Sequence, residues 1–385
     1  MSDFTLVCPC HFGTEAVLKR EIYDLGYDTG DVTDGRVSFF GDEEAIVRAN
    51  MCLRSAERVL LMVGKFTARS FEELFEGIKS LPWEDFLPGD AAFWVTKAAG
   101  VRSKLFSSSD IQSVAKKAMV ERMKTKYGLE VFPEDGEKYP VRIFIRNDEV
   151  EVTLDTSGDS LHKRGYRILH GGAPISETLA ASLIMLTPWK KDRILADPFC
   201  GSGTFLIEAA MMAANIAPGL NRDFTAKKWT NIIPAGMWKE IRAELMDEID
   251  MPDPWDVDLQ GFDADPEILR AAGANARAAG VADMIHFKTC NAADFSHSKK
   301  YGFVITNPPY GERLEDMDTL PGIYMGISQV MERMPTWSFY IITAWDETGS
   351  VIRRKPQKIR KLYNGMIRTG YYMYPGEKPP KRNIT

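Results

Sequence analysis

The chain has 385 residues, of which 44% are hydrophobic and 26% are charged, and its formal net charge is −6. A chain of this length and composition is expected to fold into two or three units with proper cores, which excludes an intrinsically disordered protein. No apolar run approaches the roughly 20 residues of a membrane helix, and the N-terminus lacks a basic start and an apolar signal core, so we expect a cytoplasmic protein with no membrane partner.

Residues 1–65 alternate short apolar runs typical of strands with amphipathic stretches typical of helices. The strand-like runs are FTLVC and RVSFF, Gly26 closes the first helical stretch, and Gly41 and Asp42 open the second. A β-α-β-α order of this size predicts a small α+β domain of ferredoxin-like type.

Residues 66–160 predict a second small α+β domain. Its expected elements are a helix over 70–83, a strand over 91–98, a long helix over 107–128, and two strands over 139–148 and 149–158 that form a hairpin.

Two segments are strongly basic although the whole protein is acidic. Residues 97–126 contain eight Lys or Arg and two acidic residues, and residues 351–368 contain seven Lys or Arg and no acidic residue. Because phosphate binding needs cations where the nucleic-acid backbone lies, local charge matters more than the total. Each segment considered alone fits a solvated surface as well as it fits a nucleic-acid contact.

The five cysteines are scattered along the chain. Only Cys8 and Cys10 lie close together, and no second pair of Cys or His stands at a matching spacing. We therefore expect neither a disulfide framework nor a bound metal ion.

Residues 161–385 predict a third and larger domain. The segment 161–175 is rich in Gly, Pro and basic residues and marks the boundary. Beyond it, apolar strands alternate with helices, which predicts an α/β fold with a doubly wound, mostly parallel sheet and a ligand at the carboxyl ends of its strands. The expected domains are therefore 1–65, 66–160 and 161–385.

The motif ILADPFCGSGTF, residues 194–205, passes from a strand through a glycine turn into a helix. Gly201 and Gly203 let the backbone approach a ligand, and the free N–H groups at the start of the helix can bind it. The spacing of the glycines is neither that of dinucleotide enzymes nor that of a P-loop, which disfavours NAD and ATP.

Two acidic residues follow later strands of the same pattern. Asp263 ends the next strand, where a carboxylate can accept from ribose hydroxyls, although a surface turn explains it equally well. Asp294 can accept from an adenine amino group or cap its own turn. Because Asp263 lies 62 residues after Gly201, we expect residues 215–255 to be an insertion.

The motif FVITNPPYG, residues 303–311, is an apolar strand followed by Asn307, Pro308, Pro309 and Tyr310. The prolines fix the turn, so that the Asn307 side-chain oxygen and the Pro308 carbonyl can accept the two hydrogens of a planar amino group. Acceptors that draw an aryl amine toward tetrahedral geometry lower the barrier to methyl transfer. Tyr310 can stack on a base that has left its helix.

With the motifs DPFCGSGTF, GFDAD and NPPYGERL, the chain resembles the bacterial THUMP-domain RNA methyltransferases that make N2-methylguanosine in large-subunit (23S) ribosomal RNA. The resemblance spans nearly the whole chain. It implies a ferredoxin-like domain, a THUMP RNA-binding domain and a class I, Rossmann-like methyltransferase domain that uses S-adenosylmethionine. Some relatives carry a second methyltransferase domain, and since this chain ends shortly after YYMYPG, we expect one activity at most.

The resemblance also implies roles for individual residues. The expected cofactor contacts are Asp197, Phe199, Gly201, Gly203, Thr204, Asp263, Ala264, Asp294 and Asn307. The expected target-amine site comprises Asn307, Pro308, Pro309 and Tyr310. The expected RNA contacts are Lys104, Lys116, Lys117 and Lys124 in the first basic segment, and Lys163, Arg164 and Tyr166, which resemble a basic-aromatic segment of the family and can meet RNA or cofactor.

Other functions share part of this pattern. A tRNA guanine-N2 methyltransferase fits the same residues, and a DNA adenine-N6 or cytosine-N4 methyltransferase shares the amine-binding motif. The small α+β pair with its basic helix favours structured RNA over DNA, and a protein glutamine amide fits less well. A non-catalytic RNA-binding protein is disfavoured because the motifs are intact. The pattern does not indicate an oligomeric state.

Overall fold

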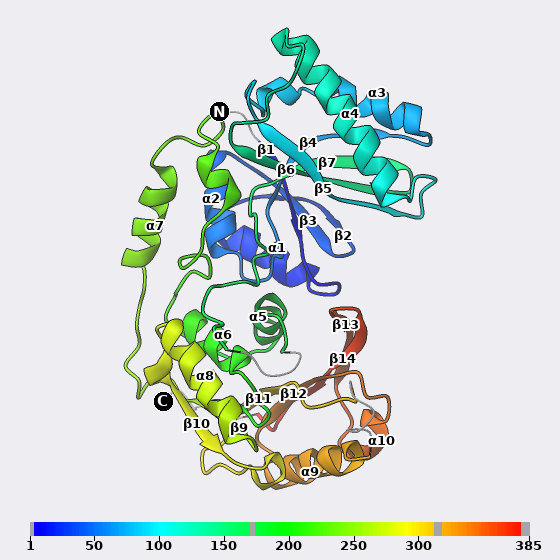
Figure 1. The fold of residues 1–385 in the computed structure, drawn as a ribbon. Helices are drawn as coiled ribbons and strands as arrows, with labels where there is room; N and C mark the ends of the chain where they lie inside the picture. The colour runs from blue at the N-terminus through cyan, green and yellow to red at the C-terminus, as the bar shows by residue number, and fades with distance from the viewer. Residues whose placement is uncertain (1–3, 170–173, 312–317, 379–385) are drawn as a thin grey trace, which may run out of the picture. The chain divides into compact units, whose positions relative to one another are not determined.

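The computed structural model describes residues 4–169, 174–311 and 318–378, which form two compact units (Figure 1). The units are not contiguous in sequence. Among the described residues, the first unit comprises 4–9, 19–161 and 223–244, and the second comprises 10–18, 162–222 and 245–378.

A seven-stranded sheet forms the framework of the first unit, in the order β2-β3-β1-β4-β7-β6-β5. Its strands are β1 (Phe4–Pro9), β2 (Thr29–Thr33), β3 (Arg36–Gly41), β4 (Leu60–Thr67), β5 (Ala92–Val101), β6 (Lys138–Arg146) and β7 (Glu149–Asp155). Only β5 and β6 pair in parallel. Strand β4 pairs with both β1 and β7, so one continuous sheet contains strands from both expected N-terminal domains. The expected boundary between those domains, at residues 65 and 66, lies within β4 and stays a prediction.

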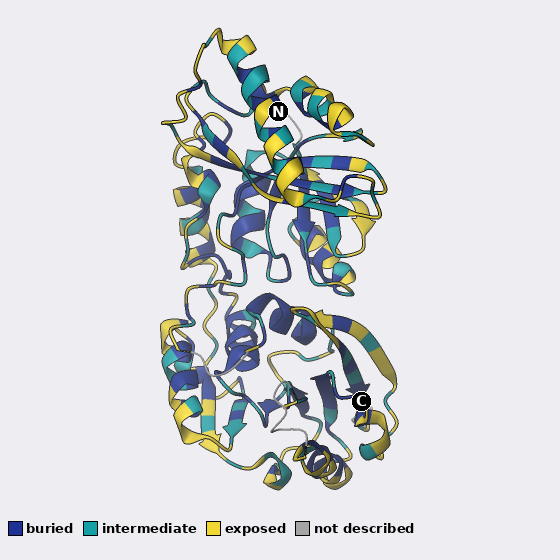
Figure 2. Ribbon diagram, turned by 45° about the vertical axis from the view of Figure 1, so that its right-hand side comes forward, coloured by how far each residue is buried: buried dark blue, intermediate teal, exposed yellow. Residues whose placement is uncertain are grey.

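Figure 2 shows buried and more exposed residues mixed along the strands of this sheet, and in β6 the two alternate over residues 141–146. In β6, for example, Val141 and Ile143 are buried, whereas Arg142 and Arg146 are partly exposed on the opposite face. A period of two is expected where one face of a sheet is covered and the other is not.

Three helices of the first unit follow the expected pattern: α2 (Glu43–Cys52), α3 (Phe71–Ser80) and α4 (Ser108–Tyr127). The expected helix α1 (Glu15–Asp24) is also present, with residues 15–18 in the second unit and 19–24 in the first. The Asp42 side chain accepts from the Ala45 N–H at 3.1 Å and thereby caps α2. Helix α4 ends at Gly128, which adopts the left-handed conformation expected of a C-terminal glycine. Figure 1 shows α4 crossing over β5, with α3 beside it.

The segment 223–244 belongs to the first unit although it lies within the expected insertion at 215–255. It contains the short helix η2 (Thr225–Lys228), and α7 (Met237–Asp247) begins in it. The Trp229 ring stacks on Tyr139 with 4.7 Å between centroids. The Tyr139 hydroxyl donates to the Asn231 amide oxygen at 2.6 Å. The insertion thus supplies a structural part of the N-terminal unit.

Residues 10–18 belong to the second unit in return. Arg360 Nη1 donates to the Gly13 carbonyl at 3.0 Å. The Phe12 ring meets Tyr363 edge-on, with 6.0 Å between centroids. Each unit therefore includes a segment that is surrounded in sequence by the other.

The second unit is built on a mostly parallel sheet in the order β10-β9-β8-β11-β12-β14-β13. Its strands are β8 (Leu195–Asp197), β9 (Leu259–Asp263), β10 (Ile285–Thr289), β11 (Phe303–Thr306), β12 (Ser338–Thr343), β13 (Lys358–Asn364) and β14 (Ile367–Tyr374). Strands β8 to β12 are parallel, and β14 is antiparallel to both of its neighbours. The doubly wound fold expected from the sequence is confirmed.

The order of the strands predicts where a ligand binds. The chain runs outward from β8 to β10 and then returns to place β11 on the other side of β8. In such sheets, the crevice outside the carboxyl ends of the two strands at the reversal is the usual binding site. Here those ends are Asp197 in β8 and Asn307 directly after β11.

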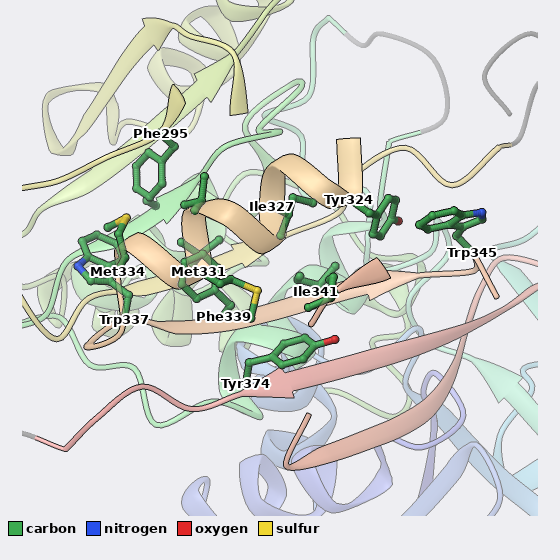
Figure 3. Packing of buried hydrophobic residues seen from close by; sticks show 14 of the residues in the cluster. Phe295, Tyr324, Ile327, Met331, Met334, Trp337, Phe339, Ile341, Trp345 and Tyr374 are labelled. Atoms are coloured by element: carbon green, nitrogen blue, oxygen red, sulfur yellow. The ribbon is translucent and has the colours of Figure 1, made fainter. Parts of the chain in front are cut away.

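The helices of the second unit are α5 (Glu177–Met185), α6 (Thr204–Ala213), α8 (Pro266–Ala278), α9 (Leu320–Arg333) and α10 (Thr348–Val351), with the short helices η3 (Ala282–Met284) and η4 (Ala292–Asp294). Figure 3 shows α9 packed on the sheet, with Ile327 and Met331 near Phe339 and Ile341 of β12 and with the Tyr324 ring beside Trp345. This cluster includes Val304 of β11, the strand that leads directly into the loop containing Asn307. Among the described residues, no helix is both long enough and apolar enough to cross a membrane.

Candidate active site

A cavity of about 180 Å³ lies at the carboxyl ends of β8 and β11. Its lining residues come from the end of β8, the glycine turn, the start of α6, α8, the loop after β11 and the segment just before α5. They are Pro174, Ile175, Asp197, Phe199, Cys200, Gly201, Ser202, Thr204, Phe205, Ile268 and Asn307. The structure therefore brings together five residues that the sequence placed at a cofactor site: Asp197, Phe199, Gly201, Thr204 and Asn307.

The backbone conformation of the turn requires glycine at two positions. Gly201 has φ = +51° and Gly203 has φ = +85°, a region that strains residues with a side chain. A Cβ atom on Gly203 would also lie 3.3 Å from Ala272 and from Phe287. The turn delivers the chain into the first turn of α6, whose free N–H groups and positive helix end favour a polar or anionic ligand group.

Asp197 is a buried carboxyl at the end of β8, with 2% of its surface exposed. Its Oδ1 accepts from the Thr306 hydroxyl at 2.6 Å and from the Phe199 N–H at 3.1 Å. Burial raises the pKa of Asp197 to about 7, and the nearby charge of Asp263 contributes a smaller increase. A cationic ligand group beside this carboxyl would reverse that shift.

Asp263 is attached to the glycine turn. Its Oδ2 accepts from the Gly201 N–H at 3.0 Å, and its Oδ1 accepts from the Asp265 N–H at 3.1 Å. Ala264 and Asp294 are exposed, and neither lines the cavity. Their expected cofactor contacts stay predictions, as does that of Gly203.

Asn307 follows β11 and lines the same cavity as the glycine turn. Its side-chain oxygen Oδ1 is buried and accepts no hydrogen bond from any described residue. A buried acceptor without a donor is costly, so such an atom at a cavity wall is suited to receive a donor from a ligand. In the same loop, the Pro309 carbonyl accepts from the Tyr324 hydroxyl at 3.2 Å.

Tyr310 differs from its sequence-based expectation. Only 9% of its surface is exposed, and its ring belongs to the cluster beneath α9. Its hydroxyl accepts from the Asn364 side-chain amide at 3.0 Å. A ring packed on this cluster does not offer the open stacking face that was expected. In this conformation, Tyr310 instead links the loop to the end of β13.

Arg164 and Tyr166 also differ from the expectation that they contact RNA. Both are only 2% exposed, so neither presents a surface to RNA. The Tyr166 hydroxyl donates to Glu208 Oε1 at 3.0 Å, and Arg164 Nε lies 3.5 Å from the same oxygen. The buried carboxylate on α6 explains why a tyrosine and an arginine are held inside. Lys163, which directly precedes Arg164, is exposed.

Arg167 is a site residue that sequence reasoning missed. Its Nη2 donates to the Ile175 carbonyl at 3.0 Å and to the Thr204 hydroxyl at 3.1 Å, both of which belong to residues that line the cavity. Its Nε donates to Glu177 at 2.8 Å. The signal lay in the basic-aromatic segment, but the pattern did not separate Arg167 from Arg164.

The four lysines expected to contact RNA in the first unit have different surroundings. Lys104 and Lys117 are exposed, and Lys124 is half-buried. Lys116 is paired with Glu134 and lies 3.9 Å from the centre of the Phe93 ring. The second basic segment lies mainly on the β13–β14 hairpin, where Lys358, Lys361 and Arg368 are exposed.

A mostly parallel sheet in this order, with a glycine turn after its first strand and an amide acceptor after its fourth, defines a class I methyltransferase fold. The RMKL-like methyltransferase domain model matches residues 164–372. The models of the RlmL ferredoxin-like domain and of the THUMP domain match residues 5–60 and 68–155. The chain therefore belongs to the RMKL-like family of S-adenosylmethionine-dependent methyltransferases, which confirms the resemblance and the expected cofactor class.

Two relatives illustrate the family. The chain is 42% identical to the putative RNA methyltransferase YpsC of Bacillus subtilis, over 100% of this chain and 99% of that protein. It is 32% identical to the ribosomal RNA large subunit methyltransferase K/L of Dichelobacter nodosus, over 99% of this chain and 54% of that protein. The chain thus spans about half the length of the K/L relatives that it matches.

Three solved structures are similar over nearly the whole chain. A possible methylase from Clostridium difficile is 45% identical with a TM-score of 0.94, covering 99% of this chain and 100% of that one. SMU.472, a putative methyltransferase complexed with S-adenosylhomocysteine, is 39% identical with a TM-score of 0.91 and the same coverage. A predicted N6-adenine-specific DNA methylase from Listeria monocytogenes is 44% identical with a TM-score of 0.90, covering 98% and 97%.

The residues around the cavity fit the family's cofactor. The buried Asp197 carboxyl suits a cationic group, and Gly201 lines the cavity without a side chain, so a ligand can approach the backbone of the turn closely. Among the described residues, no group of three or more His, Cys, Asp or Glu side chains is arranged to hold a metal ion.

Proposed function

We propose that this protein transfers a methyl group from S-adenosylmethionine to the exocyclic N2 of a guanine in large-subunit ribosomal RNA. The observation that carries the proposal is the buried, unpartnered Oδ1 of Asn307 in the wall of the cavity that contains the glycine turn. The cytoplasmic location and the domain boundaries expected from the sequence belong to the same proposal.

The cofactor-binding role falls to residues at the switch point of the sheet. Asp197 lines this end of the cavity, and a cationic ligand group beside its buried carboxyl would favour the charged form of that carboxyl. Asp263 holds the glycine turn through the Gly201 N–H. Gly201 and Thr204 contribute the turn and the first turn of α6. S-adenosylmethionine, when bound, supplies an electrophilic methyl group on a positively charged sulfur.

Asn307 has the role of binding the target amine. An amide oxygen accepts an N–H of the guanine amino group, and the Pro308 carbonyl is proposed to accept the second. An aryl amine is a poor nucleophile because its lone pair is delocalised into the ring. Two fixed acceptors favour a pyramidal nitrogen with a localised lone pair, which is a form of transition-state stabilisation that needs no side-chain base. The proton lost from nitrogen can pass to solvent.

Two observations support RNA as the substrate. The first unit contains a THUMP domain, and the relatives named above carry RNA methyltransferase names. The β13–β14 hairpin exposes Lys358, Lys361 and Arg368, and its Asn364 donates to Tyr310 in the amine-binding loop. A basic hairpin attached to that loop suits a polyanion whose base must reach Asn307.

DNA is the second candidate, because one similar structure is titled a predicted N6-adenine-specific DNA methylase. Adenine N6 presents the same planar amine to Asn307, so the amine site alone does not separate the two. Transfer RNA is a further alternative for the same guanine chemistry.

The deciding experiment is transfer of tritiated methyl groups to total RNA, to separated ribosomal and transfer RNA, and to genomic DNA from a strain that lacks the protein. Digestion to nucleosides then identifies the product. N2-methylguanosine in the large-subunit ribosomal RNA is the expected result. N6-methyladenine in DNA, or label in tRNA alone, would replace the proposal.

A further inference from the structure

A second cavity, of about 410 Å³, lies on the sheet of the first unit. Its lining includes basic side chains and one tryptophan, and it comes from the strands β5 and β6, the end of β7, the segments before β4 and after β7, and η2. The lining residues are Arg58, Trp94, Thr96, Lys97, Lys138, Pro140, Arg142, Asp155, Gly158 and Thr225. We call this cavity the Lys97 pocket.

A β-bulge places Lys97 in the pocket. Trp94 pairs with Pro140 and Val95 with Val141, but the next pairing is Lys97 with Arg142, so that Thr96 is an extra residue in β5. Without the extra residue, Trp94 and Lys97 would point to opposite faces of the sheet. The bulge brings both to one face, and bulges commonly re-aim side chains in this way at sheet edges.

The charges in the pocket do not balance. Arg58 and Arg142 both bind Asp155, at 2.6 Å and 3.1 Å, and Asp155 is the only carboxylate among the described residues that line the pocket. Among the described residues, neither Lys97 nor Lys138 forms an ion pair. Burial lowers the pKa of Lys97, and the positive charges of Arg142, Arg58 and Arg36 lower it further. An anion in the pocket would relieve this repulsion.

Two neighbouring basic surfaces of this unit differ from the pocket in their charge balance. The neighbouring cavity on the same sheet is lined by Arg36, Lys65 and Arg146 but also by four carboxylates, those of Asp31, Asp34, Glu149 and Glu151. On α4, three of the basic residues are paired: Lys116 with Glu134, and Arg122 and Lys126 with Glu84. Of these two cavities, the one beside Lys97 therefore has the larger unneutralised positive charge among the described residues.

Trp94 adds an apolar wall to the pocket, and 41% of its surface is exposed. An exposed tryptophan beside unpaired lysines is suited to stack on a nucleobase while the cations bind the phosphate next to it. A free inorganic anion would use the lysines but not the ring.

We propose that the Lys97 pocket binds a backbone phosphate of the RNA substrate, with an adjacent unpaired base stacked on Trp94. This inference rests on the proposed function and gives RNA a contact site on the open face of the sheet, in place of the α4 surface that the sequence favoured.

The test measures the affinity of the full-length protein for a short, fluorescently labelled single-stranded RNA over a series of salt concentrations. The pocket variant is Lys97→Gln/Lys138→Gln. The charge-matched control is Lys19→Gln/Lys239→Gln, two exposed lysines elsewhere in the unit. We expect the pocket variant to bind about tenfold more weakly. The slope of its log–log salt dependence is expected to become shallower by about 0.7, because this is the contribution of one phosphate contact to a single strand. The control is expected to match the wild type.

The Trp94→Ala variant tests the stacking part. It is expected to lose roughly 5- to 150-fold in affinity for the RNA and much less for an abasic oligonucleotide of the same length. Competition by inorganic phosphate alone, with no effect of Trp94→Ala on RNA affinity, would show a site for free anions and overturn the proposal. If the Lys117→Gln/Lys124→Gln variant lost more RNA affinity than the pocket variant, the main RNA contact would lie on α4 and the pocket proposal would be overturned.

Thermal unfolding and S-adenosylmethionine titration of every variant separate binding from folding, because the pocket and the cofactor cavity belong to different units. If the wild type methylates RNA and the pocket variant binds it equally well, the pocket proposal alone fails. If the wild type methylates no RNA, the proposed function fails and this inference falls with it.

Discussion

Asn275 on α8 donates a hydrogen bond from its buried side-chain amide to the carbonyl oxygen of Ser202, at 3.2 Å, within the glycine turn. The same side chain donates to the Leu169 carbonyl at 2.8 Å and accepts from the N–H groups of Ile168 and Leu169 at 3.0 Å and 3.1 Å. One amide thus uses its full bonding capacity to join the segment ahead of α5 to the turn that lines the cofactor cavity.

The Asn275→Ala variant is expected to bind S-adenosylmethionine about tenfold more weakly and to lose roughly 2–4 kcal/mol of unfolding free energy, since buried backbone groups lose their partners. Calorimetric titration and chemical denaturation measure the two effects. Arg277→Ala, an exposed change on the same helix, is the control. Cofactor affinity equal to that of the wild type in Asn275→Ala would limit the residue to a role in folding.

The Asp197→Asn variant is expected to stabilise the cofactor-free protein and to weaken cofactor binding. The carboxyl has a folded-state pKa of about 7, above its ordinary value of 3.8, so its stabilising contribution is full below that ordinary value and is lost as the pH rises through 7. The stability gap between the variant and the wild type should therefore widen from pH 5 to pH 7 and level off above, at up to about 4 kcal/mol. Thermal unfolding across this range measures the gap, and a gap that narrows with rising pH would contradict the assignment.

The Asn307→Ala variant is expected to retain cofactor binding but to lose about 100- to 1,000-fold in the rate of methyl transfer, the range seen when one preorganised hydrogen-bonding group is removed from a transition state. Asn307→Asp keeps an acceptor oxygen and should lose less. Single-turnover transfer with saturating cofactor separates the chemical step from binding. Unchanged transfer by Asn307→Ala would remove the residue from the amine site.

The Tyr166→Phe variant is expected to lower the free energy of unfolding by about 1–2 kcal/mol, because Glu208 loses a donor in the interior, and to leave RNA affinity unchanged. Denaturant titration and RNA-binding measurements are made on the same preparation. Weaker RNA binding at unchanged stability would restore Tyr166 to the RNA surface, contrary to its burial.

The parts of the site that could be predicted are those in which short-range sequence sets the geometry. Gly201 and Gly203 follow an apolar strand and precede an apolar helix, so the turn and its position at the sheet edge follow from local pattern. Asn307 was found in the same way, since a buried strand must end before two prolines.

The parts that could not be predicted depend on partners distant in sequence. Arg164 and Arg167 lie in the same basic segment, and the local sequence does not distinguish them. Arg164 is buried because the fold places it beside Glu208, whereas Arg167 reaches the cavity because it binds Thr204. The same holds for Lys97. Its direction depends on a register shift between β5 and β6 that no periodicity revealed.

The stacking of Trp229 on Tyr139 has a consequence for biosynthesis. The N-terminal unit acquires its final segment only when residue 244 has left the ribosome, after the glycine turn and α6 have already been made. Until then, Tyr139 lacks the Trp229 ring that stacks on it. The N-terminal unit is therefore incomplete while the first part of the methyltransferase domain is being synthesised. An N-terminal fragment that ends near residue 161 would lack residues 223–244, so Tyr139 would remain without its stacking partner.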